Sequence, residues 1–328
     1  MISRQRLSRI RELASGREVA VIGDLMLDEF LSGSVERVSP EAPVPVLTYT
    51  SHRYVLGGAG NAARTLASLG ARVRLVGLIG GDAAGSVLVD EAEAVGLDAS
   101  GIVVDPRRTT ALKTRVMAQG QQLVRIDREA AGKAGVASRR RLREAALSAL
   151  ASSHAVVMSD YDKGTLRVGL VRELLAECRG CGVPSIVDTK ALHTAYRGAT
   201  VLTPNVSELA KLAGMHKLAD KDIRKAAAIV MRRLAPDALL VTRAEAGMSL
   251  FAHDADEVRI AALATEVRDV TGAGDTVAAA LALGLAAGLP RAEAAQLATL
   301  AAAVVVRKAG TAAPSWDEMA TFAEATGR

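Results

Sequence analysis

The stretch Asp269-Val270-Thr271-Gly272-Ala273-Gly274-Asp275-Thr276 leads directly into an Ala/Leu-rich segment that runs from Val277 to Ala287. The small residues at 272–274 allow backbone N–H groups to crowd around an anion at the positive end of the helix that this segment predicts. A carboxylate follows at once. This order of groups suits phosphoryl transfer to a hydroxyl, because N–H donors stabilise the charge that the transferred group spreads over its oxygens.

Asp275 is the candidate group that receives the proton of the attacking hydroxyl, and Gly272, Ala273 and Gly274 form the candidate anion hole. A carboxylate with an ordinary pKa near ~4 cannot ionise a free alcohol, so we expect Asp275 to orient the hydroxyl and to accept its proton late. A short Gly-x-Gly before a helix is more often a simple tight turn. The polar residues on both sides of this stretch favour the catalytic interpretation.

The composition indicates one large domain that does not cross a membrane. Half of the 328 residues are hydrophobic, which is enough for one large core, and we expect a single domain over residues 1–328. No apolar run approaches the roughly 20 residues that span a bilayer. Residues 1–13 have the pattern of an amphipathic helix rather than of a secretory signal. The sequence therefore predicts a cytoplasmic protein without a membrane partner.

The charge pattern excludes some classes of partner. The net charge is +5, but aromatic residues make up only 2% of the chain and the basic residues are scattered, apart from an Arg-rich run at 139–143. Nucleic-acid binding requires a basic face with stacking residues, so we expect no nucleic-acid partner and interpret the run as a solvated helix face. A basic balance suits phosphorylated small molecules. Cys178 and Cys181 form a single CxxC, which lacks the second pair that a zinc site needs.

Short β-branched runs alternate with longer Ala/Leu-rich helical patterns along the chain. This alternation predicts an α/β fold with a doubly wound, mostly parallel sheet that has helices on both faces. Two segments break the rhythm. Residues 44–49 alternate with prolines in the manner of an edge strand, and residues 110–117 and 123–126 flank Gln119-Gly120-Gln121 like a hairpin. We expect a small β-sheet lid from about 30–52 and 109–127.

Polar residues follow several predicted strands. In open α/β sheets, ligands bind outside the carboxyl ends of the strands, so these side chains are expected to rim one cleft. Taken singly, each is more often a helix cap or a turn residue. They are Asp24, Asp28, Asp160, Asp188, Asn205 and Arg243.

Two motifs resemble the signatures of the ribokinase-like (PfkB) carbohydrate kinases. Gly57-Gly58-Ala59-Gly60-Asn61 is similar to the first signature and Asp269–Thr276 to the second, and the resemblance covers nearly the whole chain. It implies a ribokinase-like fold, a β-lid that often forms a homodimer interface, ATP as phosphate donor and accompanying Mg²⁺. It also implies that Asp275 is the catalytic base and that the glycine stretch before it is the anion hole.

The resemblance further implies a nucleotide and metal site. Asn205 and Glu208 are similar to the family's N-x-x-E motif, which helps to hold the metal and the phosphates, with Glu208 acting through water. Some members also bind a monovalent cation such as K⁺ near the position of Asp269, which leaves K⁺ open here. The remaining positions implied to contact the nucleotide are Thr242, Arg243, Glu245, Gly247 and Thr271.

Several segments, among them Ser39–Val46 and Ser159–Gly164, are similar to the D-glycero-β-D-manno-heptose 7-phosphate kinases. The activity that this implies moves the γ-phosphate of ATP onto the anomeric C1 hydroxyl and gives the 1,7-bisphosphate, in the biosynthesis of nucleotide-activated heptose. Some members are fused to a nucleotidyltransferase domain, which we do not expect in a chain of this length. The alternatives are a related kinase for another sugar, sugar phosphate or nucleoside, and a catalytically silent sugar- or nucleotide-binding protein.

A substrate that already carries a phosphate needs basic residues at the far end of its pocket. Arg125 belongs to the basic candidates, and Lys163 and Lys190 follow strand ends and are expected to face the cleft. Asp24, by the resemblance, contacts sugar hydroxyls. The substrate-binding candidates are Asp24, Asp28, Gly57, Gly58, Asn61, Lys113, Arg115, Asp160, Lys163, Asp188 and Lys190.

The chain departs from the heptose kinases at three places. Leu27-Asp28-Glu29-Phe30 stands where they read L-D-R-Y, which changes a charge near the sugar, and Asp188-Thr189-Lys190 stands where they read D-P-K. Ala244 replaces the glycine of their T-R-G-E motif. Because alanine disfavours positive φ, we expect the turn at Ala244 to do without it.

Overall fold

The computed structural model describes residues 2–129, 132–190, 194–253, 255–264 and 266–326. Its main sheet has nine strands in the order β13-β12-β11-β10-β9-β8-β1-β4-β5. The strands from β11 to β5 in this order are parallel, and β12 and β13 are antiparallel, so the predicted mostly parallel α/β fold is confirmed. The strands are β1 (Glu18–Gly23), β4 (Arg72–Gly80), β5 (Asp98–Asp105), β8 (Ala155–Asp160), β9 (Ser185–Thr189), β10 (Val201–Leu202), β11 (Ala238–Thr242), β12 (Met248–Ala252) and β13 (Val258–Ile260).

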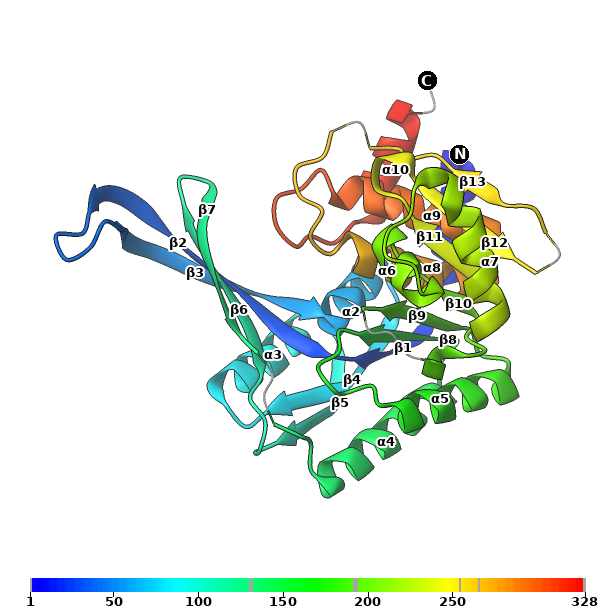
Figure 1. Ribbon diagram of the computed structural model, residues 1–328, viewed down its shortest axis with the longest axis horizontal. Coiled ribbons are helices and arrows are strands. Elements are labelled where there is room, and N and C mark those ends of the chain that lie inside the picture. Colours follow the sequence, from blue (N-terminus) through cyan, green and yellow to red (C-terminus); the bar gives the residue numbers. More distant parts are fainter. Residues whose placement is uncertain (1, 130–131, 191–193, 254, 265, 327–328) are drawn as a thin grey trace.

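Helices cover both faces of this sheet (Figure 1). Successive side chains of a strand point to opposite faces, and accordingly Val19 and Val21 of β1 lie in one hydrophobic core while Ala20 and Ile22 lie in the other. The first core holds α1 (Arg4–Ala14), α2 (Ala59–Ser68), α3 (Ala83–Ala94), α8 (Ala273–Ala286), α9 (Arg291–Val305) and α10 (Trp316–Thr326). The second holds α4 (Val136–Ala151), α5 (Val168–Cys181), α6 (Val206–Ala213) and α7 (Ile223–Leu234).

Helix α8 is the most enclosed helix of the first core. It packs against α2 and α9, and every residue from 275 to 284 is buried. A helix that is hydrophobic on all sides is expected in such a position. Across the part of the chain that the structure describes, no helix combines the length and the apolar run that crossing a membrane requires.

A second sheet of four strands projects from the body of the protein (Figure 1). Its order is β3-β2-β6-β7, so β3 lies at an edge as predicted, and β6 and β7 form the predicted hairpin. Gln119 and Gly120 both have positive φ, +48° and +80°, which is typical of a two-residue type I′ turn. The lid strands are β2 (Leu25–Val38), β3 (Pro45–Gly58), β6 (Ala111–Ala118) and β7 (Gln121–Arg128), so β2 and β3 extend further toward the core than the expected 30–52.

The chain reverses its winding direction beside β1. After β1 it passes through the lid to β4 and β5 on one side, and after β7 and α4 it returns to β8 on the other side. The point between the carboxyl ends of β1 and β8 is therefore a topological switch point, where open α/β sheets bind ligands. The segments that leave these two strands begin at Asp24 and at Asp160.

The close approach of β1 and β8 at Gly23 gives a test of this arrangement. A Cβ on Gly23 would overlap the carbonyl oxygen of Ser159 and lie 3.1 Å from the Cβ of Ala59. We expect Gly23→Ala to lower the free energy of unfolding by about 2–3 kcal/mol, because the strands must move apart. The measurement is urea unfolding followed by circular dichroism.

Gly180→Ala is the matched control for that experiment. A Cβ at this position in α5 meets no atom within 4 Å, and alanine is the better helix former, so we expect stability to rise by roughly 0.5 kcal/mol. Equal unfolding midpoints for the two variants would contradict the close packing of β1 against β8.

Candidate active site

Asp275 lies in the first turn of α8 and is buried, with 4% of its surface exposed. Asn61 of α2 donates a hydrogen bond from Nδ2 to its Oδ2 at 2.9 Å. Tyr161, from the loop after β8, donates its hydroxyl to the Oδ1 at 2.8 Å. Two neutral donors from distant parts of the chain thus fix the orientation of this carboxylate.

The surroundings of Asp275 weaken its acidity. Burial, followed by the nearby charge of Asp188, raises the pKa of Asp275 to about 7, against the opposing effect of its hydrogen bonds to Asn61 and Tyr161. Burial also raises the pKa of Tyr161 well above its ordinary value, so its phenol stays neutral and remains a donor. A carboxylate that takes up and releases a proton near pH 7 matches the requirement for a general base at neutral pH.

The start of α8 presents backbone donors beside this carboxylate. Gly272 precedes the helix with φ +79°, and a Cβ there would lie 2.5 Å from Nδ2 of Asn61, so the position requires glycine for both conformation and space. The N–H of Ala273 donates to the carbonyl of Val270 at 3.2 Å. Among the described residues, the N–H groups of Gly272 and Gly274 have no acceptor, so two of the three predicted donors are available to an anion.

Asp269 holds the stretch before α8 in place. Its Oδ1 accepts the N–H of Thr271 at 2.9 Å, and its Oδ2 accepts the N–H of Gly310 at 3.0 Å. Both carboxylate oxygens are therefore used to join this stretch to the segment after α9. Thr271, a predicted nucleotide contact, lies at this junction.

Lys190, which follows β9, lies beside the end of α8. Its Nζ is 3.2 Å from Oδ1 of Asp188 and 3.1 Å from Oε1 of Glu208. A Cβ on Gly274 would lie 3.8 Å from the same Nζ. Burial alone would lower the pKa of Lys190, but the charges of Asp188, Glu208 and Asp275 outweigh burial and raise it, so the ammonium stays charged. The structure thus places Lys190 at the anion hole.

Asn205 and Glu208 form a capping box at the start of α6. The Oδ1 of Asn205 accepts the N–H of Glu208 at 2.9 Å, and the Oε2 of Glu208 accepts the N–H of Asn205 at 2.8 Å. The reciprocal bonds satisfy donors at the helix start and leave Oε1 of Glu208 facing Lys190. Asn205 also pairs with Thr242, which brings the end of β11 to the same edge.

The donor set near Lys190 fits a magnesium ion that arrives with phosphates. Mg²⁺ keeps several waters and is commonly held by one or two carboxylates together with substrate phosphates. Asp188 and Glu208 are two such carboxylates beside the anion hole. Over the described ranges, no group of three or more His, Cys, Asp or Glu side chains could enclose a metal ion by itself.

Asp24 and Asp160 anchor the loop after β8, and each is 1% exposed. The Oδ2 of Asp24 accepts the N–H groups of Tyr161 and Lys163 at 2.9 and 3.0 Å, and its Oδ1 accepts the N–H of Thr165 at 3.0 Å. Asp160 accepts a backbone N–H two residues on and the hydroxyl of a buried tyrosine. Asp24, a predicted sugar contact, thus holds the loop that positions Tyr161.

One face of the lid carries a cluster of charges. The register of β2 with β3 and β6 puts Asp28 beside Lys113, and Phe30 between Arg53 and Arg115, on the same face. Arg115 pairs with Asp28 at 2.7 Å. The guanidinium carbons of Arg53 and Arg115 lie 4.2 and 5.2 Å from the ring centre of Phe30. Lys113 has no ion-pair partner among the described residues. We name the three cations Arg53, Lys113 and Arg115 the lid basic cluster.

The lid basic cluster faces the core domain. The ring of Phe30 lies 3.7 Å from the position that a Cβ on Gly310 would occupy. A Cβ on Gly57 would lie 2.9 Å from Oδ2 of Asp28, so glycine at this position leaves room for the carboxylate, which is 4% exposed. Gly58 has φ +56° where the chain turns into α2. Glu29, the charge that departs from the heptose kinase pattern, accepts the hydroxyl of a lid threonine at 2.6 Å on the opposite face.

Other basic candidates are engaged elsewhere. Lys163 forms an ion pair with Glu129, and Arg125 forms one with Asp127 at 2.8 Å on the lid surface. Among the residues that sequence reasoning missed are Tyr161, Arg53 and Arg64; Arg64 donates to Oδ1 of Asn61 at 3.1 Å. Tyr161 could have been found from the sequence, because it lies inside a segment that resembles the heptose kinases. Arg53 is identified only by strand register and Arg64 only by its position on α2.

The turn after β11 contains the predicted nucleotide contacts and one correction. Arg243 donates to the hydroxyl of Ser249 at 2.9 Å and pairs with Asp220, while Glu245 is exposed. Gly247 has φ +82°, and a Cβ there would overlap a carbonyl oxygen of the following segment. The expectation for Ala244 was wrong: it has φ +50°. The turn that joins β11 to β12 imposes this conformation, at a cost of about 1 kcal/mol.

Comparison with known proteins agrees with this geometry. The family model described as "pfkB family carbohydrate kinase" matches residues 17–318. The protein named bifunctional protein HldE of Geobacter sulfurreducens is 45% identical over 296 residues, and that of Azorhizobium caulinodans is 46% identical over 310. These alignments cover 90% and 94% of this chain but only 60% and 64% of the relatives, so the chain spans less than two thirds of their length.

Solved structures share the fold. Arabidopsis thaliana ribokinase complexed with ribose and ATP has a TM-score of 0.72 and 20% identity, with coverage of 94% of this chain and 98% of that one. Escherichia coli phosphofructokinase-2 in complex with fructose-6-phosphate has a TM-score of 0.74 and 21% identity, with coverage of 95% and 100%. At these identities the likeness extends to the ribokinase-like fold alone.

The chain belongs to the pfkB family of carbohydrate kinases. The sequence-based prediction of an ATP-dependent sugar kinase is thereby confirmed at the level of the family, whose members typically use ATP with Mg²⁺.

Asp275→Asn tests the role of the buried carboxylate. The amide keeps the shape but cannot accept the proton, so we expect kcat to fall by about 10²–10⁴-fold. Nucleotide binding should persist, because the N–H groups of Gly272 and Gly274 are untouched. ADP formation in the presence of a sugar acceptor measures kcat, and calorimetry measures ATP binding. Turnover near the wild-type rate would remove Asp275 from the mechanism.

The same variant has a predicted effect on stability. Because the pKa of Asp275 is about 7 in the folded protein and near ~4 in the unfolded chain, the folded state binds more protons between these pH values, and stability is lost as pH rises through them. We expect Asp275→Asn to gain stability relative to wild type from pH 4 to pH 8, by at most about 1.4 kcal/mol per pH unit. Thermal unfolding at several pH values gives this difference, and a difference that is flat with pH would contradict the raised pKa.

Proposed function

We propose that this protein is an ATP-dependent kinase that phosphorylates the anomeric C1 hydroxyl of D-glycero-β-D-manno-heptose 7-phosphate, in the cytoplasm, where ATP is available. The observation that carries the proposal is the position of Asp275 between the anion hole and the lid basic cluster. The segments Ser39–Val46 and Ser159–Gly164, which resemble heptose 7-phosphate kinases, support the choice of sugar.

At the phosphate-transfer end, the roles follow from charge and position. The N–H groups of Gly272 and Gly274 and the ammonium of Lys190 are placed to stabilise the γ-phosphoryl group. Asp188 and Glu208 would hold a magnesium ion, which would supply further neutralisation of phosphate charge. Asp275 orients the sugar hydroxyl and accepts its proton as the new P–O bond forms and the bond from the γ-phosphorus to the leaving ADP breaks.

At the other end, the lid basic cluster is proposed to hold the 7-phosphate. Arg53, Lys113 and Arg115 share one face with the carboxylate of Asp28. The neighbouring Arg125 and Asp127 on this face neutralise each other, so the face keeps excess positive charge. Asp28 and Asn61 are assigned to the sugar hydroxyls between the two ends. Lys163 and Lys190, expected from the sequence to meet the 7-phosphate, are engaged with Glu129 and with the anion hole instead.

A panel of acceptors tests the substrate. We expect the purified protein with ATP and Mg²⁺ to phosphorylate heptose 7-phosphate at C1, with a kcat/KM at least about 100-fold above that for hexose and pentose phosphates, because a misplaced distal phosphate loses charge-assisted hydrogen bonds. Phosphorus NMR locates the new phosphate. Faster turnover of another sugar phosphate would establish the alternative of a related kinase, and no turnover of any acceptor would establish a silent binding protein.

Variants of the lid test whether its basic cluster binds the 7-phosphate of the sugar and not ATP. Lys113→Gln combined with Arg53→Gln should raise KM for the 7-phosphate more than tenfold and leave KM for ATP near its wild-type value. Arg125→Gln is the control, since Arg125 lies opposite Arg115 on the same lid face but its charge is already paired with Asp127. Equal losses in the double variant and the control would count against the assignment.

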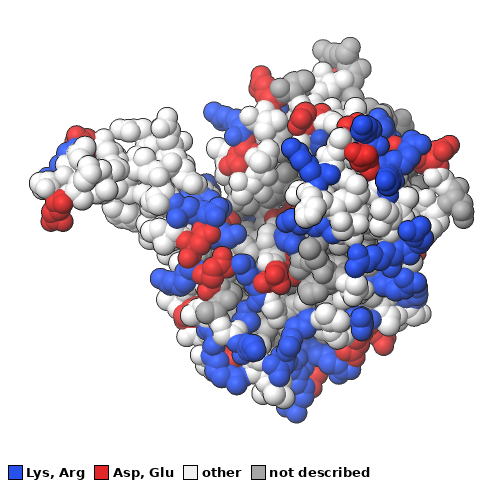
Figure 2. Space-filling model, viewed as in Figure 1, with Lys and Arg blue, Asp and Glu red and all other residues white. Residues whose placement is uncertain are grey.

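The lid is also proposed to join two copies of the chain. Exposed large hydrophobic side chains gather on it, and Figure 2 shows the projecting lid as largely uncharged. On the face opposite the basic cluster, Val124 is 50% and Ile126 57% exposed. Such a surface is more apolar than a monomer needs. The exposed large hydrophobic residues of the lid are Val38, Val44, Tyr49, Leu123, Val124 and Ile126.

Ile126→Glu should therefore shift the protein from dimer to monomer in sedimentation equilibrium, because a carboxylate would be buried without a partner at the interface. Val258→Glu, an equally simple change at an exposed position on β13, should leave the dimer intact. A wild-type protein that is monomeric at all working concentrations would refute the dimer.

A further inference from the structure

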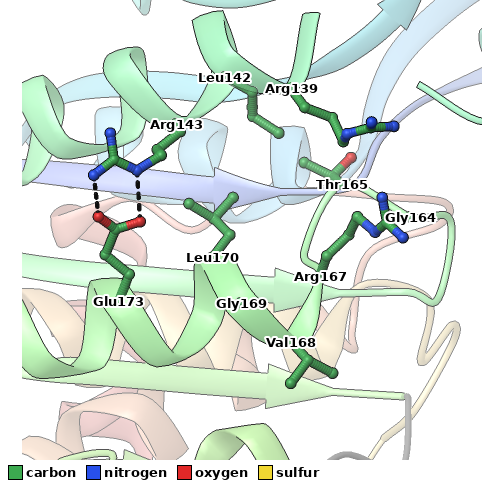
Figure 3. Close-up of a pocket in the computed structure, with 10 residues that line it drawn as sticks. All are labelled: Arg139, Leu142, Arg143, Gly164, Thr165, Arg167, Val168, Gly169, Leu170 and Glu173. Carbon is green, nitrogen blue, oxygen red and sulfur yellow. Dashed lines mark hydrogen bonds and ion pairs between the residues drawn. The ribbon is translucent and has the colours of Figure 1, made fainter. Parts of the chain in front are cut away.

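A cavity of about 600 Å³ opens between α4 and α5, apart from the active site (Figure 3). It is lined by the Arg-rich run of α4, by Gly164 and Thr165 of the loop after β8, and by the first turn of α5. In the view of Figure 2 many Lys and Arg side chains cover the lower part of the molecule, where Figure 1 places these two helices. The run at 139–143, expected to be a solvated face, therefore also builds a concave surface.

Positive charge at one end of this cavity lacks compensation. The guanidinium groups of Arg139 and Arg167 lie at the same end, near Thr165 (Figure 3). Arg139 bonds to the backbone carbonyl of Ala134, and over the described part of the chain neither arginine has a carboxylate partner. At the opposite end Arg143 is neutralised by an ion pair with Glu173. The cavity thus has one neutral end and one end with two unpaired cations.

The same end contains the start of α5. Arg167 occupies the N-cap position and its side chain makes no capping bond, and within the described residues the N–H groups of Val168, Gly169 and Leu170 have no acceptor. Gly169 has no side chain to cover these donors, and a Cβ there would meet no atom within 4 Å. Uncapped N–H groups at a helix start favour an anion.

The hydroxyl of Thr165 supplies an independent indication of a ligand. Thr165 is 2% exposed and lines the cavity, its N–H is bound to Asp24, and among the described residues no group hydrogen-bonds its hydroxyl. The hydroxyl oxygen is not one of the unpartnered atoms that the protein fully encloses, so it is open to the cavity and placed to donate to a group there. The cations, helix donors and hydroxyl meet at one point, which matches the several acceptor oxygens of a phosphate group.

We propose that the cavity between α4 and α5 is a second anion site that binds the phosphate group of a phosphate monoester. Arg139 and Arg167 pair with the phosphate, the first turn of α5 donates N–H groups to it, and Thr165 donates its hydroxyl. The volume is within the range of small-molecule sites and leaves room for the organic part of the ester. This site does not depend on the sugar that the enzyme phosphorylates.

The position of the site links it to catalysis. Thr165 and Tyr161 are held by the same carboxylate, Asp24, from opposite ends of one short loop. Tyr161 in turn donates to Asp275. A ligand that draws Thr165 toward the cavity therefore acts on the loop that orients the catalytic carboxylate.

The test measures binding of inorganic phosphate by calorimetry, with Mg²⁺ and a non-hydrolysable ATP analogue present throughout so that the end of α8 is occupied. We expect wild type to bind phosphate and Arg139→Gln/Arg167→Gln to bind it at least about tenfold more weakly, with Thr165→Val intermediate. The control is Arg140→Gln/Arg172→Gln, which changes two exposed arginines of the same helices that do not line the cavity.

An unchanged Kd in the double variant, or no binding by wild type, would overturn the proposal. If the melting temperature of the double variant shows loss of folding, Arg167→Gln alone takes its place, since Arg167 is exposed. The titration is repeated with AMP and with glucose 6-phosphate. Tighter binding of either ester than of inorganic phosphate, lost in the double variant, supports a metabolite ligand. If inorganic phosphate binds more tightly than both esters, the proposal that the ligand is a phosphate monoester is overturned, and the cavity is a site for inorganic anions.

Discussion

A buried carboxylate whose hydrogen-bond partners, within the described residues, are all neutral sets the conditions for the whole active site. Asp275 is held by Asn61 and Tyr161, while the nearby cation Lys190 is engaged by Asp188 and Glu208. A direct ion pair with Lys190 would lower the pKa of Asp275 and weaken it as a proton acceptor. Neutral donors fix the orientation of the carboxylate and still allow burial to raise its pKa. The orientation of the Asp275 carboxylate is therefore set by its two hydrogen-bond donors, whereas its pKa is raised mainly by burial.

The fold could be predicted from the sequence wherever a pattern is local. The alternation of apolar strands with amphipathic helices gave the doubly wound sheet, and α8 was recognised from the Ala/Leu-rich run after Asp275. The short elements α6 and β13 give no clear signal in the sequence, because eight and three residues are too few to show a diagnostic hydrophobic period. The positive φ of Ala244 was missed because the hydrogen bonds of the turn between β11 and β12, and not the preference of alanine, determine that conformation.

For the site, the sequence indicated which residues gather at the sheet edge but not which way they face. Asp24 and Asp28 both follow β1 and both looked like sugar contacts, yet Asp24 is used by three backbone N–H groups and Asp28 pairs with Arg115 on the lid. The lid basic cluster depends on pairing between strands that are far apart in the chain, as with Phe30 and Arg115. Such long-range register has no signature in a single sequence.

The distribution of charge determines the orientation in which the proposed substrates bind. Carboxylates outnumber cations around Lys190, so phosphates approach that end favourably only together with a metal cation, as the magnesium complex of ATP does. The lid basic cluster has the opposite balance, because the charges of Arg53, Lys113 and Arg115 exceed that of Asp28 while the adjacent Arg125–Asp127 pair is neutral, and it attracts a free phosphate monoester without a metal. A sugar phosphate bound in the reverse orientation would place its phosphate beside Asp275, Asp188 and Glu208. Repulsion by these groups selects the orientation in which the hydroxyl, and not the phosphate, meets Asp275.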